Sequence, residues 1–180
     1  YKEAAKEEGT IAKAIGDNST GFSEAKVVLE AEYEFPFLAH ASMEPMNCVA
    51  QFSSEGIEMW YGCQGPTMDQ YAVANALDIR PDQVKINTLF AGGSFGRRAN
   101  KDSDFVLEAA LIAKKTKSDS PIKLVWTRED DMRSGYFRPM YFHKMRAGLN
   151  GEGRIVAWEH KIVGQSIITG TAFEAKAFKN

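Results

Sequence analysis

Cysteine and histidine are scarce in this chain, and their scarcity limits the metal sites that it can build. The 180 residues include two cysteines and three histidines. Cys48 and Cys63 are too few for a disulfide-dense secreted scaffold, a zinc framework or an iron–sulfur cluster held by four thiolates. The simplest interpretation is two reduced, buried cysteines. His143 and His160 lie in predicted strands and are expected to be ordinary sheet residues.

The sequence also lacks a surplus of either charge and any long apolar run. Lys and Arg number 22 and Asp and Glu 24, which gives a net charge of −2, whereas nucleic-acid-binding proteins usually carry a basic surplus. No apolar stretch approaches the roughly 20 residues of a membrane-spanning helix, and no signal peptide opens the chain. We therefore expect no nucleic-acid partner and no membrane span. The apolar share of 44% is typical of a globular domain.

Apolar periodicity predicts a mixed α+β fold. Period-two patterns and turn residues predict strands over residues 26–35, 84–90 and 122–126 and hairpins over residues 48–61 and 143–163. Helical spacing predicts two main helices, over residues 66–78 and 102–115. This order favours a mixed sheet with hairpins over a doubly wound parallel sheet. Residues 1–24 are expected to be a connector from a preceding region, and residues 25–180 part of one domain.

A glycine-rich loop is the first candidate site. The sequence from Gly92 to Arg98 is Gly-Gly-Ser-Phe-Gly-Arg-Arg, and it follows a predicted strand and precedes a predicted helix. Glycines let backbone N–H groups approach an anion, a helix N-terminus adds favourable potential, and arginines bind phosphate. A tight turn with solvated arginines remains the alternative. The loop matches neither a P-loop nor the dinucleotide fingerprint. Phe95, between glycines, is a candidate pocket wall.

Three other segments contain polar groups with possible roles. Gln64 ends a predicted strand, where its amide can point into a cleft or cap the next helix. His40 and Glu44 suggest metal or acid–base chemistry, but a third ligand is not apparent, and a polar loop held by hydrogen bonds is the simpler interpretation. Residues 128–133 are expected to form a surface ion-pair cluster. Arg138 could orient a substrate or a cofactor phosphate.

The order of these segments resembles a known family. Ala-Ser-Met-Glu-Pro at 41–45, Cys63-Gln64, the glycine loop and Trp-Thr-Arg-Glu-Asp-Asp-Met at 126–132 follow one another. Together they resemble the molybdopterin-binding large subunit of the xanthine dehydrogenase and aldehyde oxidase family, with the greatest likeness to the bacterial isoquinoline 1-oxidoreductase beta-subunit type. The likeness covers about residues 25–164. The ordered combination is specific, although each motif alone is not.

The resemblance implies a molybdenum–pterin cofactor, in its cytosine dinucleotide form. The cofactor-binding residues that it implies are Gln64, Gly92, Gly93, Ser94, Phe95, Gly96 and Arg97. In that family the glutamine donates a hydrogen bond to an oxo ligand of the molybdenum. The resemblance also implies substrate contacts from Phe95 and Arg138. It implies no catalytic residue and no protein metal ligand in this chain, because the family's general base is a glutamate of a later segment.

Some positions depart from the family pattern. Ser94 replaces the third glycine of the xanthine dehydrogenase loop, and Ala99 replaces the glutamate that orients purines. A purine substrate is therefore not expected. Phe137 stands at the place of the substrate-loop arginine, with Arg138 one residue later.

The resemblance implies the function of a larger assembly. This chain would be a piece of a subunit that oxidises an N-heterocycle or an aldehyde with oxygen from water, and it would be inactive alone. Electrons would leave through 2Fe–2S clusters on a small partner subunit. A non-catalytic α+β binding or assembly module is the alternative. The location, bacterial cytoplasm or periplasm, stays open because an export signal would lie upstream of Tyr1.

Overall fold

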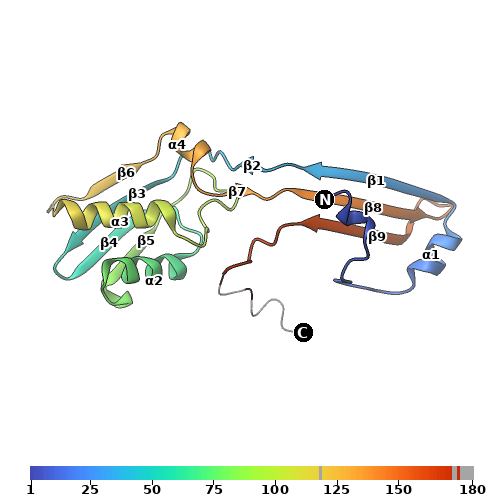
Figure 1. The fold of residues 1–180 in the computed structure, drawn as a ribbon, viewed down its shortest axis with the longest axis horizontal. Coiled ribbons are helices and arrows are strands. Elements are labelled where there is room, and N and C mark those ends of the chain that lie inside the picture. The colour runs from blue at the N-terminus through green and yellow to red at the C-terminus, as the bar shows by residue number, and fades with distance from the viewer. Residues whose placement is uncertain (118, 172–173, 175–180) are drawn as a thin grey trace. The chain divides into compact units, whose positions relative to one another are not determined.

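The chain divides into two compact units in the computed structural model, which describes residues 1–117, 119–171 and 174. The central unit is Ala39–Arg138. The terminal unit combines Tyr1–Leu38 with the chain from Pro139 onward. Figure 1 shows the elements of both units. The predicted domain boundary after residue 24 stays a prediction.

The central unit is a four-stranded mixed sheet with two main helices packed against it (Figure 1). The strand order is β5-β4-β3-β6, with β4 and β5 parallel and the other pairs antiparallel. The strands are β3 (Asn47–Ser53), β4 (Gly56–Tyr61), β5 (Val84–Thr88) and β6 (Ile122–Val125). The helices are α2 (Pro66–Leu77), α3 (Asp104–Thr116) and the short α4 (Arg128–Arg133), with a 3-10 turn, η2 (Pro81–Gln83).

The core of the central unit follows from the alternation of its strands. Cys48 and Ala50 of β3 are fully buried, because alternate residues of a strand share one face of the sheet. On α3, alanines at 109, 110 and 113 let the helix backbone approach these strands closely. Tyr61 and Phe105 meet edge to face with ring centroids 5.8 Å apart. The core therefore fixes the end of β4, from which the residues before α2 extend.

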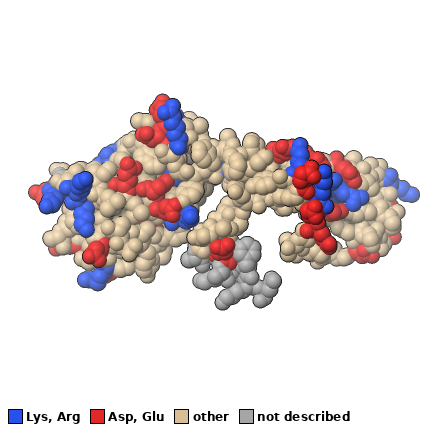
Figure 2. Space-filling view, viewed as in Figure 1, with Lys and Arg blue, Asp and Glu red and all other residues tan. Residues whose placement is uncertain are grey.

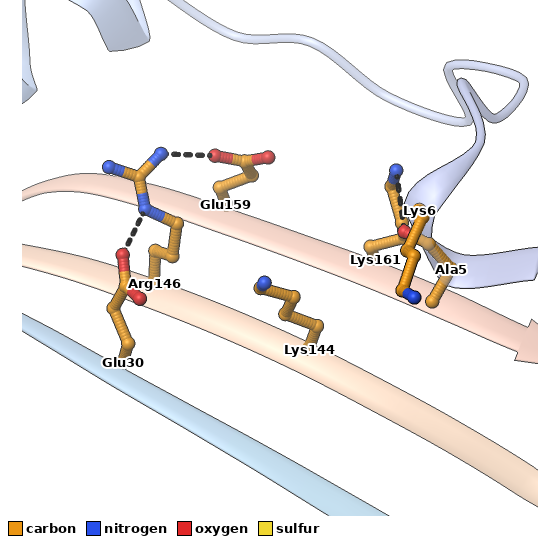
Figure 3. A pocket seen from close by; sticks show the side chains of 7 residues that line it. All are labelled: Ala5, Lys6, Glu30, Lys144, Arg146, Glu159 and Lys161. Atoms are coloured by element: carbon orange, nitrogen blue, oxygen red, sulfur yellow. Dashed lines mark hydrogen bonds and ion pairs between the residues drawn. The ribbon is translucent and has the colours of Figure 1, made fainter. Parts of the chain in front are cut away.

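The terminal unit is a three-stranded antiparallel sheet in the order β1-β8-β9. Its elements are β1 (Val27–Phe35), β8 (Tyr141–Leu149), β9 (Ile155–Gly164), α1 (Asn18–Glu24) and the 3-10 turn η1 (Ala4–Lys6). One face of the sheet is charged, and Arg146 there bridges Glu30 and Glu159 at 2.8 and 3.1 Å (Figure 3). A pocket of about 400 Å³ lies on this face, lined by Ala5, Lys6, Glu30, Lys144, Arg146, Glu159 and Lys161.

The predicted α+β class, the two main helices and both hairpins are confirmed. The strand predicted to reach residue 90 ends at Thr88. The charged segment at 128–133 is the helix α4, because the Thr127 side chain accepts from the Asp130 N–H and the Asp130 carboxylate accepts from the Thr127 N–H. Inside the predicted connector, Asp17 caps α1 by accepting from the Ser19 and Thr20 N–H groups.

Helix hydropathy and surface charge can be compared with the composition. Within the described ranges, no helix has the length and apolarity to cross a membrane. Figure 2 shows acidic and basic side chains intermingled on the face that it displays. A field of one sign is not evident there.

The β3–β4 turn depends on glycine at position 56. Gly56 has φ +142°, and a Cβ there would collide with the Gln83 carbonyl and lie 2.9 Å from the Gln83 Cβ. We predict that Gly56→Ala lowers the free energy of unfolding by about 2 kcal/mol or more, because it adds a clash to the backbone strain. Urea unfolding followed by circular dichroism measures the loss.

The matched control is Gly153→Ala in the β8–β9 turn. Gly153 also has a positive φ, +78°, but nothing lies within 4 Å of the position that a Cβ would take. This variant should lose only the strain, about 1 kcal/mol. Equal losses in the two variants would contradict the clash at position 56.

Candidate functional site

The glycine loop has a backbone that its residue types largely dictate. Gly93 and Gly96 have φ +91° and +98°, a region that glycine enters without steric cost. At Gly92 φ is ordinary, but a Cβ would lie 2.6 Å from the Glu44 Cβ. Phe95 adopts φ +57° without being a glycine, which costs energy for a residue with a large side chain. Phe95 is 74% exposed, and its role as a pocket wall stays a prediction.

The loop presents a row of unpaired backbone donors. The Gly92 N–H donates to the Glu44 carboxylate at 2.7 Å. The next four N–H groups, from Gly93 to Gly96, have no acceptor among the residues that the structure describes. Consecutive free N–H groups beside left-handed residues form the kind of concavity that binds anions. The geometry therefore supports the anion-binding interpretation over a simple tight turn.

Gln64 and the glycine loop are joined by a hydrogen bond. The Ser94 hydroxyl donates to Gln64 Oε1, and the Arg98 N–H donates to the same hydroxyl at 3.2 Å. Gln64 does not cap α2, whose N-cap is Gly65 without a side-chain hydrogen bond. The amide N–H₂ of Gln64 has no acceptor within the described part of the chain, and the residue is exposed. Its oxygen is thus anchored while its donors stay available.

Arg98 binds three segments at once. Its Nε donates to the Gly93 carbonyl at 3.2 Å, and Nη1 to the Gly62 carbonyl at 3.4 Å. Its Nη2 donates to the backbone carbonyl and the carboxylate of Glu44, at 3.2 and 3.0 Å. The residue is 2% exposed. A buried guanidinium is stable only with such partners, so Arg98 fixes the glycine loop, the end of β4 and the loop that contains Glu44.

Glu44 is a structural anchor of this arrangement. Besides Gly92 and Arg98 it accepts from Asn47 Nδ2 at 2.9 Å. The Gly92 N–H and the Asn47 amide hold the pKa of Glu44 below its ordinary value. The interpretation of a polar loop held by hydrogen bonds is therefore confirmed for Glu44. No group of three or more His, Cys, Asp or Glu residues that could hold a metal occurs in the described ranges.

His40 lies apart from the Glu44 hydrogen bonds. Its Nδ1 is buried without a hydrogen-bond partner among the described residues, and burial lowers the pKa of the ring. Arg138, the predicted substrate residue, is half-buried in β7 (Phe137–Arg138), which pairs with β2 (Leu38–Ala39).

Arg97 and Arg98, which follow the loop, are both buried. The alternative interpretation of a tight turn with solvated arginines is therefore wrong. The Arg97 guanidinium is buried, donates to both carboxylate oxygens of Asp104 at 3.2 and 2.7 Å, and stacks 5.3 Å from the Trp126 ring centroid. The helix α3 begins only at Asp104, after an intervening turn. A helix N-terminus therefore does not directly follow Gly96.

Arg128 corrects the prediction of a surface ion-pair cluster at 128–133. Its Nη1 donates at 2.6 Å to Asp131, which is buried. Its Nη2 donates to the carbonyls of Ser42 and Met43. The Ser42 hydroxyl in turn donates to the Ser94 carbonyl at 3.2 Å. Arg128 therefore contacts the glycine loop indirectly, through Ser42.

Asp69 is a residue that the sequence interpretation missed. It is buried on α2 and accepts from Tyr61 at 2.8 Å, Cys63 at 3.1 Å and Ser103 at 2.6 Å. Burial raises the pKa of the Cys63 thiol to about 11, so it stays protonated. Since Cys63 precedes Gln64, Asp69 positions the backbone from which Gln64 extends. The only sequence indication was a carboxylate in the first turn of a predicted helix.

The buried guanidinium gives a stability prediction. Arg98→Met should lower the free energy of unfolding by about 3 kcal/mol, because Glu44 and three carbonyls lose their donor. Chemical denaturation measures this change. Arg80→Met, at an exposed arginine paired with Asp82, is the control and should leave the midpoint unchanged. An unaltered midpoint in Arg98→Met would refute the role of the guanidinium.

Glu44 gives a pH prediction. Its pKa in the folded state lies below the ordinary 4.5, so its contribution to stability is complete above that pH and is lost as the pH falls through the folded pKa. Glu44→Gln should therefore be less stable at neutral pH, and the difference should shrink in acid. Urea titrations at several pH values test this. Glu55→Gln, which changes an exposed carboxylate of the β3–β4 turn, is the control and should leave the stability at neutral pH unchanged.

Comparison with known proteins adds three results. A family model described as "Molybdopterin cofactor-binding domain" matches residues 2–175. The membrane-bound aldehyde dehydrogenase [pyrroloquinoline-quinone] of Gluconacetobacter polyoxogenes is 32% identical over 78% of this chain and 18% of its own. The isoquinoline 1-oxidoreductase subunit beta of Brevundimonas diminuta is 32% identical over 81% of this chain and 18% of its own.

A solved structure confirms the likeness at the level of fold. Quinoline 2-oxidoreductase from Pseudomonas putida 86 superposes with a TM-score of 0.63 at 19% identity, over 81% of this chain and 18% of that chain. The chain thus spans about a fifth of the length of these relatives. The match of the family model over nearly the whole sequence, with Gln64 joined to the glycine loop, shows that this chain belongs to the molybdopterin cofactor-binding domain family.

Proposed function

We propose that the chain is part of the molybdopterin-binding subunit of a molybdenum hydroxylase. This enzyme would oxidise an N-heterocycle or an aldehyde with oxygen from water. The observation that supports the proposal most directly is the row of free N–H groups from Gly93 to Gly96 beside the free amide donors of Gln64. A pterin cofactor has an anionic phosphate tail and oxygen ligands on its metal, both of which accept hydrogen bonds.

The residues of this chain would bind and orient the cofactor. Gln64 would donate from its amide, whose oxygen is fixed by Ser94. Gly92 to Gly96 would donate backbone N–H groups, and Arg97 would support them through Asp104. When bound, the cofactor supplies the oxidation–reduction chemistry. We propose the cytosine dinucleotide form, with 2Fe–2S clusters on a small partner subunit, and no activity for this piece alone.

The substrate side of the site would be formed by Phe95 and Arg138. The exposed Phe95 ring offers a flat apolar wall for an aromatic heterocycle. Two named relatives support this substrate range, since one is an isoquinoline oxidoreductase subunit and the other an aldehyde dehydrogenase. The purine-orienting glutamate is absent at Ala99, so purines fall outside the proposal.

The test is cofactor analysis of the full-length protein purified with its small subunit. Molybdenum and pterin should both be present. Gly93→Val should lower their content at least about tenfold, because a branched side chain at φ +91° displaces the free N–H groups. Gln64→Leu should lower it through loss of the amide donors. Gly9→Val, at a glycine with open space around it, is the control.

Two outcomes would contradict the proposal. Absence of both molybdenum and pterin from the wild-type assembly would favour the non-catalytic α+β module. Pyrroloquinoline quinone in their place would assign a different redox cofactor, the one named for the Gluconacetobacter relative. The intact pairing of Gln64 with Ser94 favours the molybdenum hydroxylase over the module.

A further inference from the structure

The two histidines of the terminal sheet face each other across neighbouring strands. His143 of β8 and His160 of β9 are diagonal neighbours, because Met145 is the direct partner of His160 and Ile162 that of His143. Their ring nitrogens Nδ1 and Nε2 are 2.8 Å apart, and the rings are tilted by 31°. The sequence predicts both histidines as ordinary strand residues and does not predict that their rings pair.

We propose that His143 Nδ1 and His160 Nε2 chelate a divalent transition-metal ion of tetragonal geometry, Cu²⁺ above all. Two ligands at about 2.0 Å from a metal lie about 2.8 Å apart when the angle between them is about 90°, as in square-planar sites, and about 3.3 Å apart in a tetrahedral zinc site. The separation of the two nitrogens is 2.8 Å. When the metal binds, the proton between the two nitrogens moves through solvent to the other nitrogen of the ring that carries it, so both rings stay neutral. Rotation of each ring about its soft terminal torsion, by about 45°, turns both lone pairs toward the ion.

The surroundings hold the rings in place and leave them accessible. Phe35 meets the His143 ring edge to face at 5.2 Å, and Trp158 meets the His160 ring in the same way at 6.5 Å. His160 is exposed and His143 half-buried. Ordered rings of this kind lose little conformational entropy when they bind a metal.

The electrostatics of this face favour neutral imidazole ligands. Alternation places Glu30, Lys144, Arg146 and Glu159 on the opposite face, and within β1, β8 and β9 no Asp, Glu, Lys or Arg shares the face of the two histidines. No charged side chain of these strands therefore competes for the ion, and water completes its coordination.

Titration of the untagged chain with Cu²⁺, followed by calorimetry and electron paramagnetic resonance, tests the proposal. The expected result is one Cu²⁺ per chain, with an axial spectrum and coupling to two nitrogens. His143→Gln and His160→Gln should each lower the affinity at least about tenfold. His40→Gln changes the one remaining histidine, which lies in the central unit, and should bind as the wild type does.

Three results would overturn the proposal. The first is an unchanged affinity for Cu²⁺ in both His143→Gln and His160→Gln. The second is a loss of Cu²⁺ affinity in His40→Gln equal to that in the two sheet variants. The third is tighter binding of Zn²⁺ than of Ni²⁺ by the wild-type chain, which would contradict tetragonal geometry. Circular dichroism of each variant checks that the sheet remains folded. Because the site lies outside the glycine loop, its failure would leave the proposed molybdenum–pterin function unaffected.

Discussion

The buried guanidinium of Arg98 is the interaction on which the candidate site depends. A cation in the interior is costly unless several acceptors surround it. Here three carbonyls and the Glu44 carboxylate supply them. Because these acceptors belong to the glycine loop, the end of β4 and the loop before β3, pairing the charge brings all three segments together. The Gly93 carbonyl turns toward the arginine, and the N–H groups from Gly93 to Gly96 are left without an acceptor among the described residues.

The location of the site could be predicted from the sequence, but its internal support could not. Gly92 to Gly96 and Gln64 follow from motif order, which is a local property. The inward turn of Arg97 depends on Asp104 and Trp126, and that of Arg98 depends on Glu44. No pattern of residue types links those positions. Sequence alone therefore leaves the arginines either solvated or bound to a ligand.

The fold shows the same division between local and distant causes. Alternation within β1 or β3 is visible in the sequence, and so the strands and hairpins could be predicted. The parallel pairing of β4 with β5 joins strands separated by α2, and only the packed core selects it. The helix α4 is a different case, because Thr127 and Asp130 form a recognisable capping box that its many charges concealed. The His143–His160 pair depends on strand register, which hydrophobic patterning fixes only approximately.

Close packing around Gly92 has a consequence for how such a site can diversify. A side chain at Gly92 would strike Glu44, and Glu44 in turn is needed by Arg98. These positions can therefore change only together, through coordinated replacements that single mutations do not reach. The side chains of Phe95 and Ala99 are exposed and do not pack against Glu44 or Arg98, although the positive φ of Phe95 limits the residue types that fit there. Natural or laboratory evolution of new substrate preferences would thus accumulate at the outward positions of the loop, while its inward positions stay fixed.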